Sequence, residues 1–154
     1  MSDDIRKSLW KELDKSAFLM VQLDASHDHA IPMTAQLDPD NDGYFYMFHN
    51  RTGRLAQGGR AMAQYSAKGH DLFACISGTL TDATSPELID AYWSRAVEPW
   101  YEGGKQDPNL QLLRFDLDDA EIWTADASVK GLFKLLTGQT IQPGELGDHA
   151  EVKL

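Results

Sequence analysis

The residues of this sequence best suited to chemistry lie in one run from His49 to Arg54, His-Asn-Arg-Thr-Gly-Arg. A turn of this composition offers two guanidinium groups, an amide, an imidazole and backbone N–H groups. The run before it, Tyr44 to His49, is aromatic at nearly every position, which predicts a strand buried on both faces. A donor-rich corner beside an apolar wall suits a planar ligand that carries a phosphate. The alternative is an ordinary surface turn whose polar side chains face water.

Two other segments resemble metal-binding patterns, and each lacks ligands. Asp38 to Gly43 carries carboxylates at the first, third and fifth places of a calcium loop, but the twelfth place is His49 rather than Glu. A hairpin turn is therefore expected there. His27 and His29 lie on one predicted loop with no clear third ligand, so they are expected to be solvated. We expect no metal site.

Cys75 is the sole cysteine, so the chain can form no internal disulfide. It lies in a predicted strand that places it on one face with Phe73. No activating base is evident nearby in the sequence, and a catalytic thiol needs one. We expect Cys75 to be a small buried side chain.

The composition predicts a single globular domain over residues 1–154. Charged residues make up 25% and hydrophobic residues 42% of the chain, which is ordinary for a globular protein. The net charge of −10 argues against nucleic-acid binding, which needs a basic surface. No apolar run approaches the ~20 residues that cross a bilayer, and the start MSDDIRKSLW lacks a signal-peptide pattern. We expect a cytoplasmic protein that binds neither nucleic acid nor membrane.

The elements that must position the corner are mostly strands. Apolar runs and alternating patterns bounded by turn residues predict strands at 17–23, 30–37, 44–49, 60–66, 71–81, 110–117 and 120–125. In the strand at 30–37, Met33 belongs to the apolar face, and Thr34 to a face that is either wet or turned toward a ligand. Asp118-Asp119 predicts a turn that makes the last two strands a hairpin.

Helices are predicted at three places. A stripe of Ile5, Leu9 and Leu13 indicates a first helix that lies across the sheet. Ser85-Pro86 opens a second helix, which is expected to stop before Pro99 and to turn Leu88, Tyr92 and Ala96 to one face. A third is predicted at 127–136, and the tail after about residue 138 is expected to be loosely held. The fold class is therefore mainly β with flanking helices, in which the sheet curls into a small barrel that removes its edges.

Three segments resemble a known family when taken together. They are IPMTAQLD from Ile31, FYMFHNRTGRLAQGGRA from Phe45 and KGHDLFACISGTL from Lys68. Their order and spacing are similar to the general stress protein 26-like branch of the pyridoxamine 5′-phosphate oxidase-like flavoproteins. Later Trp, Gly-Gly, Asp-Pro, Leu-Leu-Arg and Glu-x-Trp elements agree with that branch, so the similarity spans most of the chain.

The resemblance implies a split β-barrel homodimer that binds FMN, in some members FAD, in clefts at the dimer interface. By position in the family pattern, Met33 and Thr34 would lie along the flavin ring. Phe48, His49 and Asn50 would meet the flavin and its ribityl chain at the end of the third strand.

The resemblance also implies that Arg51 and Arg54 form the corner that receives the phosphate. Many relatives carry another Arg where this chain has Ile31. Arg51, Arg54 or Lys68 would have to replace it. Trp123, in the Glu-x-Trp element, would approach the cofactor, with a packing role in the core as the alternative.

The residues and the resemblance leave three alternative functions. They are an FMN-binding oxidoreductase related to stress response, a flavin or other planar-cofactor binding module without turnover, and a structural dimer with an empty cleft. The flavin would carry out the redox chemistry, and the protein would supply placement and electrostatics. His49 is the one titratable group near the expected ring, and a purely structural role is its alternative. No catalytic residue is assigned. The chain lacks the substrate-phosphate residues of a true pyridoxamine phosphate oxidase, so that activity is not expected.

Overall fold

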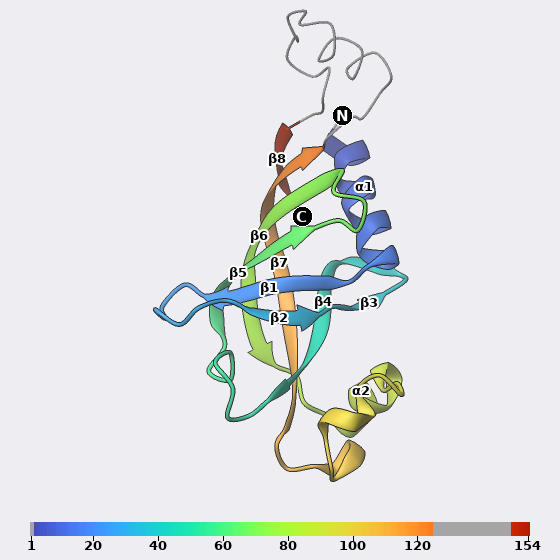
Figure 1. Ribbon diagram of the computed structural model, residues 1–154, viewed down its shortest axis with the longest axis vertical. Coiled ribbons are helices and arrows are strands. Elements are labelled where there is room, and N and C mark those ends of the chain that lie inside the picture. The colour runs from blue at the N-terminus through green and yellow to red at the C-terminus, as the bar shows by residue number, and fades with distance from the viewer. Residues whose placement is uncertain (1, 125–148) are drawn as a thin grey trace, which may run out of the picture.

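The fold is built on one antiparallel sheet. The computed structural model describes residues 2–124 and 149–154. Within these residues the sheet has eight strands, and seven of them follow the order β2-β1-β5-β6-β7-β4-β3, with β8 also paired to β7 (Figure 1). The strands are β1 (Phe18–Leu23), β2 (Ile31–Thr34), β3 (Gln36–Asp38), β4 (Asn41–Asn50), β5 (Gly59–Ser66), β6 (Leu72–Asp82), β7 (Leu110–Thr124) and β8 (His149–Lys153).

The sheet closes on itself through Ala35. The strands β2 and β3 stand at opposite ends of the strand order, yet only Ala35 separates them in the sequence. The backbone N–H of Ala35 donates to the carbonyl of Ala17 at 2.8 Å, so the chain passes from one end of the sheet to the other without a break. The single strand expected over 30–37 is thus shared between the two ends, and the predicted barrel is confirmed.

The barrel encloses one apolar core. Alternate residues of β5 and β6 are buried, as period-two patterning requires. The helix α1 (Ser2–Lys15) adds Ile5, Leu9 and Leu13 to the same core, and Leu9 and Leu13 are fully buried. The predicted first helix and its apolar stripe are therefore confirmed. The β3–β4 connection is a hairpin, in which Asp38 accepts hydrogen bonds from the backbone N–H of Asp40 and the side chain of Asn41.

The predicted turn at Asp118-Asp119 is wrong, because β7 runs unbroken from Leu110 to Thr124. Gly78 of β6 pairs with Leu117 and Ser77 pairs with Asp119, so Asp118 is the extra residue of a β-bulge. The side chain of Asp118 forms an ion pair with Arg60. A pair of aspartates resembles a turn, but the strand partners on both sides continue across it. The first half of β7 lies between β4 and β6, and the second half between β6 and β8.

The tail prediction is wrong for its last residues. Residues 149–153 form β8, which pairs with β7 from Asp119 to Trp123 and buries Val152. The helix expected at 127–136 lies outside the described residues, as does the rest of the tail up to residue 148.

The second helix is shorter than the sequence pattern indicates. The helix α2 (Pro86–Tyr92) is capped by Ser85, whose hydroxyl oxygen accepts the N–H of Leu88 at 3.2 Å, as predicted. It ends at Tyr92, and Trp93 is already extended. Two short 3₁₀ turns, η1 (Glu98–Trp100) and η2 (Gly104–Gln106), fill the loop before β7.

The face expected for the second helix is only partly as predicted. Leu88 and Tyr92 lie one turn apart and are half-buried, but the helix ends before Ala96, which is exposed, and Ile89 is its buried residue. Ile89 packs in a second, smaller cluster with Val97, Tyr101 and Leu110. Across the described residues, no helix has the length and apolar character needed to cross a membrane.

Cys75 is not the buried side chain that we expected. It shares the outer face of β6 with Phe73, as the alternation predicts, but that face is partly exposed rather than part of the core. Partial burial and, to a lesser extent, the nearby carboxylate of Glu121 raise the pKa of the Cys75 thiol. A raised thiol pKa disfavours the reactive thiolate.

Candidate functional site

The end of β4 holds a buried histidine at the base of the corner. The ring of His49 is 5% exposed, its Nδ1 lies 3.0 Å from Oε1 of Gln111, and the backbone N–H of Leu55 points to its Nε2 at 3.4 Å. Because a backbone N–H can only donate, Nε2 accepts, and Nδ1 carries the proton that it donates to Gln111. Burial lowers the pKa of His49, against the opposing effect of the Gln111 bond. His49 is therefore a neutral side chain with both nitrogens engaged.

The turn of the corner lies directly against this ring at Gly53. A Cβ on Gly53 would lie 2.5 Å from Nε2 and 2.6 Å from Cε1 of His49, distances that side-chain carbons do not tolerate. The carbonyl of Asn50 would be 3.0 Å away. Only glycine lets the turn close over the imidazole, so Gly53 and His49 fit together as one unit.

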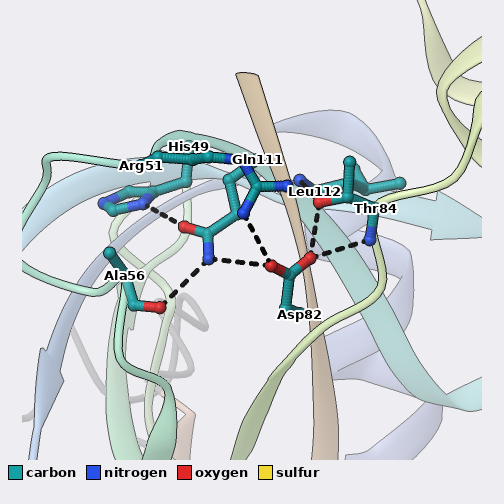
Figure 2. Close-up of polar contacts among 7 residues, drawn as sticks. All are labelled: His49, Arg51, Ala56, Asp82, Thr84, Gln111 and Leu112. Carbon is teal, nitrogen blue, oxygen red and sulfur yellow. Dashed lines mark hydrogen bonds and ion pairs between the residues drawn. The ribbon is translucent and has the colours of Figure 1, made fainter. Parts of the chain in front are cut away.

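Gln111 is the centre of the polar network beneath the corner (Figure 2). Its side chain is 2% exposed, and its Nε2 donates to the carbonyl of Ala56 at 3.0 Å and toward Oδ2 of Asp82 at 3.4 Å. Its Oε1 accepts from His49 on the opposite side. The amide thus ties the strand β4, the turn and the end of β6 together.

Asp82 joins Arg51 to this network. Its Oδ2 lies 2.9 Å from the guanidinium of Arg51, while its Oδ1 accepts the hydroxyl of Thr84 at 2.5 Å and the N–H of Thr84 at 2.9 Å. The Thr84 hydroxyl is the largest of the influences that lower the pKa of Asp82, followed by the Thr84 N–H, Arg51 and Gln111, with desolvation opposing them. Asp82 is therefore ionised, and it balances the charge of Arg51.

The backbone of the corner is largely satisfied within the chain, contrary to the expectation that its N–H groups are available to a ligand. The N–H groups of Arg51, Gly53, Ala56 and Gly58 all bond to carbonyls. Asn50 uses its side-chain oxygen to accept the N–H and the hydroxyl of Thr52, at 3.0 Å and 2.8 Å. The corner is a rigid, self-bonded turn, and its side chains are what it presents outward.

Arg54 is the second exposed arginine of the corner, besides Arg51. Its guanidinium donates to the carbonyl of His29 at 3.0 Å, which ties the corner to the loop before β2. Arg51 pairs with Asp82 and Arg60 pairs with Asp118, whereas Arg54 has no carboxylate partner within residues 2–124 and 149–154. The uncompensated positive charge of the corner therefore belongs to Arg54.

The structure brings only some of the predicted site residues together. His49, Asn50, Arg51 and Arg54 meet at the corner, and Phe48 lies beside them with its ring edge-on to Trp93, centroids 5.9 Å apart.

The two β2 candidates point in opposite directions. Met33 turns its side chain into the core, where it is 8% exposed, while Thr34 is exposed on the outer face. Met33 can therefore offer a ligand its backbone but not its side chain.

Lys68 and Trp123 lie far from the corner within one chain. The strand β5 begins at Gly59, shortly after the corner, and ends at Ser66, shortly before Lys68. A strand of eight residues spans about 25 Å, and β5 runs along the sheet in Figure 1. Trp123 is near that far end, 39% exposed, with its ring stacked on His149 at 5.0 Å.

Gln111, Asp82 and Tyr101 also belong to the site and were not predicted from the sequence. The hydroxyl of Tyr101 donates to the carbonyl of His49 at 2.9 Å, and burial is the main cause that raises its pKa to about 12. The sequence pattern could have predicted a role for Gln111, because a single polar residue inside the apolar run Leu110–Leu113 must find hydrogen bonds when it is buried. No sequence pattern marks Asp82 or Tyr101, since their partners are distant in the sequence.

The barrel and its self-bonded corner define the chain as a split-barrel protein, and comparison with known proteins places it within that class. Residues 4–142 match the family described as "Pyridoxamine 5'-phosphate oxidase like". The chain belongs to this family, in its general stress protein 26 branch.

Individual relatives agree with this placement. A general stress family protein from Xanthomonas campestris pv. campestris is 40% identical with a TM-score of 0.77, covering 94% of this chain and 99% of that one. The general stress FMN/FAD binding protein from Xanthomonas citri is 41% identical with a TM-score of 0.75, covering 92% of this chain and 99% of that one. General stress protein 26 of Bacillus subtilis (strain 168) is 34% identical over 62 residues, which are 40% of this chain and 44% of that protein.

Proposed function

We propose that this protein is an FMN-binding flavoprotein whose corner receives the flavin phosphate, chiefly through Arg54. The observation that carries the proposal is the exposed guanidinium of Arg54, held at the edge of a rigid turn without a carboxylate partner among the described residues. A phosphate is the ligand that such a group recognises best. The relative from Xanthomonas citri, itself an FMN/FAD binding protein, supports the choice of a flavin.

The other groups at the corner fit the same ligand. Arg51 gives one nitrogen to Asp82 and retains further N–H groups that can reach a phosphate oxygen. Asn50 keeps its side-chain NH₂ for the ribityl hydroxyls, because only its oxygen is used by Thr52. Thr34 and Phe48 would lie toward the ring. Ile31 stands where many relatives carry a further arginine, and it has no charge to offer a phosphate. Arg54 must therefore supply that contact.

The state of His49 favours flavin binding without proton transfer by the protein. A general acid or base needs a nitrogen that can reach the substrate, and both nitrogens of His49 are engaged inside the chain. Bound FMN would itself supply hydride or electron transfer. A flavin-dependent oxidoreductase and a non-catalytic flavin module in the cytoplasm are therefore the two candidate functions. Oxidation of a reduced nicotinamide by the flavin-loaded protein would distinguish the first from the second.

The first test is flavin binding itself. Purified protein is expected to hold about one FMN per chain, seen in its absorption spectrum and released on denaturation. In a titration of the apoprotein, Arg54→Ala should weaken FMN roughly 10- to 100-fold and leave riboflavin unchanged, because riboflavin has no phosphate to lose. The double variant with Arg51→Ala and Arg54→Ala should lose still more FMN affinity relative to its riboflavin affinity.

Arg60→Ala is the matched control, because it removes the same charge from an arginine already paired with Asp118. It should change neither affinity much. If FMN and riboflavin weaken equally in Arg54→Ala, the phosphate site lies elsewhere. A protein that neither carries flavin nor quenches added FMN would refute the proposed function.

We also propose that the protein is a homodimer with Trp123 close to the flavin of the partner subunit. The outer face of the sheet exposes large apolar side chains, namely Phe18 at 66%, Met20 at 42%, Phe73 at 41% and Trp123 at 39%. A second copy would cover such a face. Light scattering at micromolar concentration should give twice the 17.2 kDa chain mass. A monomeric mass would contradict the proposed homodimer.

Bound FMN should quench Trp fluorescence less in Trp123→Phe than in the native protein.

A further inference from the structure

The end of β7 that carries Trp123 is paired with β8 as well as with β6. Trp123 lies opposite His149 on β8 and opposite Phe73 on β6, and side chains at paired positions point to the same face of a sheet. All three side chains are exposed on the outer face. His149 is therefore a direct neighbour of the indole that the proposed homodimer places beside the flavin of the partner subunit.

Two contacts fix the imidazole of His149. Its ring is stacked on Trp123, with the centroids 5.0 Å apart and the planes inclined by 13°. Its Nε2 donates to Oε1 of Glu121 at 2.7 Å, because an ionised carboxylate can only accept a hydrogen bond. Glu121 precedes Trp123 by two residues on β7, so both side chains lie on one face of that strand. The hydrogen bond thus holds the imidazole flat against the indole.

The stack restricts the indole of Trp123. Because the two rings are nearly parallel, the imidazole covers the indole face that is turned toward β8. Trp123 is still 39% exposed, so the rest of its side chain is accessible to a second copy or to a ligand. A side chain in a strand otherwise exchanges between rotamers, and a stacked aromatic partner favours one orientation roughly 2- to 10-fold. His149 therefore selects the orientation in which Trp123 is presented.

We infer that His149 is a positioning residue of the flavin site, which holds the indole of Trp123 in the orientation that meets the flavin of the partner subunit. The inference rests on the proposed function, because it requires Trp123 to lie beside that flavin. His149 acts through the indole and need not touch the cofactor. The strand β8 thereby belongs to the site, although it pairs with the end of β7 that is remote from the corner of its own chain.

Near-UV circular dichroism of the flavin-free protein tests the positioning itself, because an aromatic ring loses its near-UV signal when its packing loosens. The Trp123 signal is the difference between the native protein and Trp123→Phe. It should fall about twofold or more in His149→Ala, whereas His149→Phe, which keeps a stacked ring, should retain most of it. Lys153→Ala is the matched control, since it shortens another exposed side chain of β8 and should leave the signal unchanged.

Fluorescence of the FMN-loaded protein tests the consequence for the site. The share of Trp quenching that Trp123→Phe removes should fall about twofold or more in His149→Ala. Combined with Trp123→Phe, His149→Ala should have no further effect, because it acts through the indole. The urea midpoint of His149→Ala should equal that of Lys153→Ala, since both side chains are exposed.

The outcomes separate the claims. An unchanged Trp123 signal in His149→Ala would overturn the inference, and so would a loss of quenching that is equal with and without Trp123. If His149→Ala and His149→Phe both lower the urea midpoint and lose the signal together, His149 only holds β8 in place, and the inference is wrong. If FMN binds but Trp123→Phe leaves the quenching unchanged, Trp123 is not beside the flavin and the inference fails with that placement. Absence of FMN binding would instead refute the proposed function.

Discussion

Gly53→Ala is expected to destabilise the protein by about 1–3 kcal/mol, the usual cost of forcing an extra carbon into a packed site. The new Cβ would lie 2.5 Å from Nε2 of His49, a buried ring that is bonded on both sides and has no room to move. The turn would have to lift away from the ring. Chemical denaturation should show a lower midpoint with an unchanged slope, and FMN affinity should fall because Asn50 and Arg54 move with the turn.

Gly43→Ala is the control for this change. A Cβ at Gly43 meets nothing within 4 Å, so the same substitution there should alter the free energy of unfolding by less than about 0.5 kcal/mol. Equal stability of the two variants would show that the turn is not packed on His49 as described.

Gln111→Leu is expected to cost more, about 2–5 kcal/mol. It leaves the Nδ1–H of His49 and the carbonyl of Ala56 without partners, and each buried group that loses its hydrogen bond costs about 1–3 kcal/mol. Leucine has a similar size, so the loss reports on hydrogen bonds rather than on a cavity. Urea unfolding followed by circular dichroism measures the change.

The control for Gln111→Leu is Gln57→Leu, the same replacement at an exposed position in the turn. Its effect should stay within about 0.5 kcal/mol. A Gln111→Leu variant as stable as Gln57→Leu would mean that water replaces the amide in the network, and that Gln111 does not hold the corner together.

Most of the fold could be predicted because local patterns and tertiary structure agree. The alternation in β5 and β6, the apolar stripe of α1 and the Ser85 cap all lie where the sequence indicates them. The bulge at Asp118 could not be predicted, since an Asp-Asp pair indicates a turn unless the strand beside it is known to continue. β8 was not predicted either, because its stability comes from pairing with β7 and not from its own composition.

The candidate site was predictable in position but not in chemistry. The run from His49 to Arg54 does form the corner, as its composition indicates. Its hydrogen bonds could not be foreseen, because Asp82 and Gln111 come from strands that are remote in the sequence. These partners engage Arg51 and His49, so Arg54 is the arginine that is left without a carboxylate partner among the described residues. Sequence alone treats the two arginines as equivalent.

The position of β7 has a consequence for how the protein is synthesised. Among the strands of the described residues, β7 is the one that pairs with both β6 and β4, and it is complete at residue 124. Until β7 leaves the ribosome, β6 at the end of the β2-β1-β5-β6 piece and β4 of the β3–β4 hairpin each have an unpaired edge, although Ala35 connects the two pieces along the chain. Long-range pairings of this kind form slowly. The nascent chain therefore passes through a stage with two unpaired strand edges that are prone to aggregate. Protection by chaperones matters most during this stage.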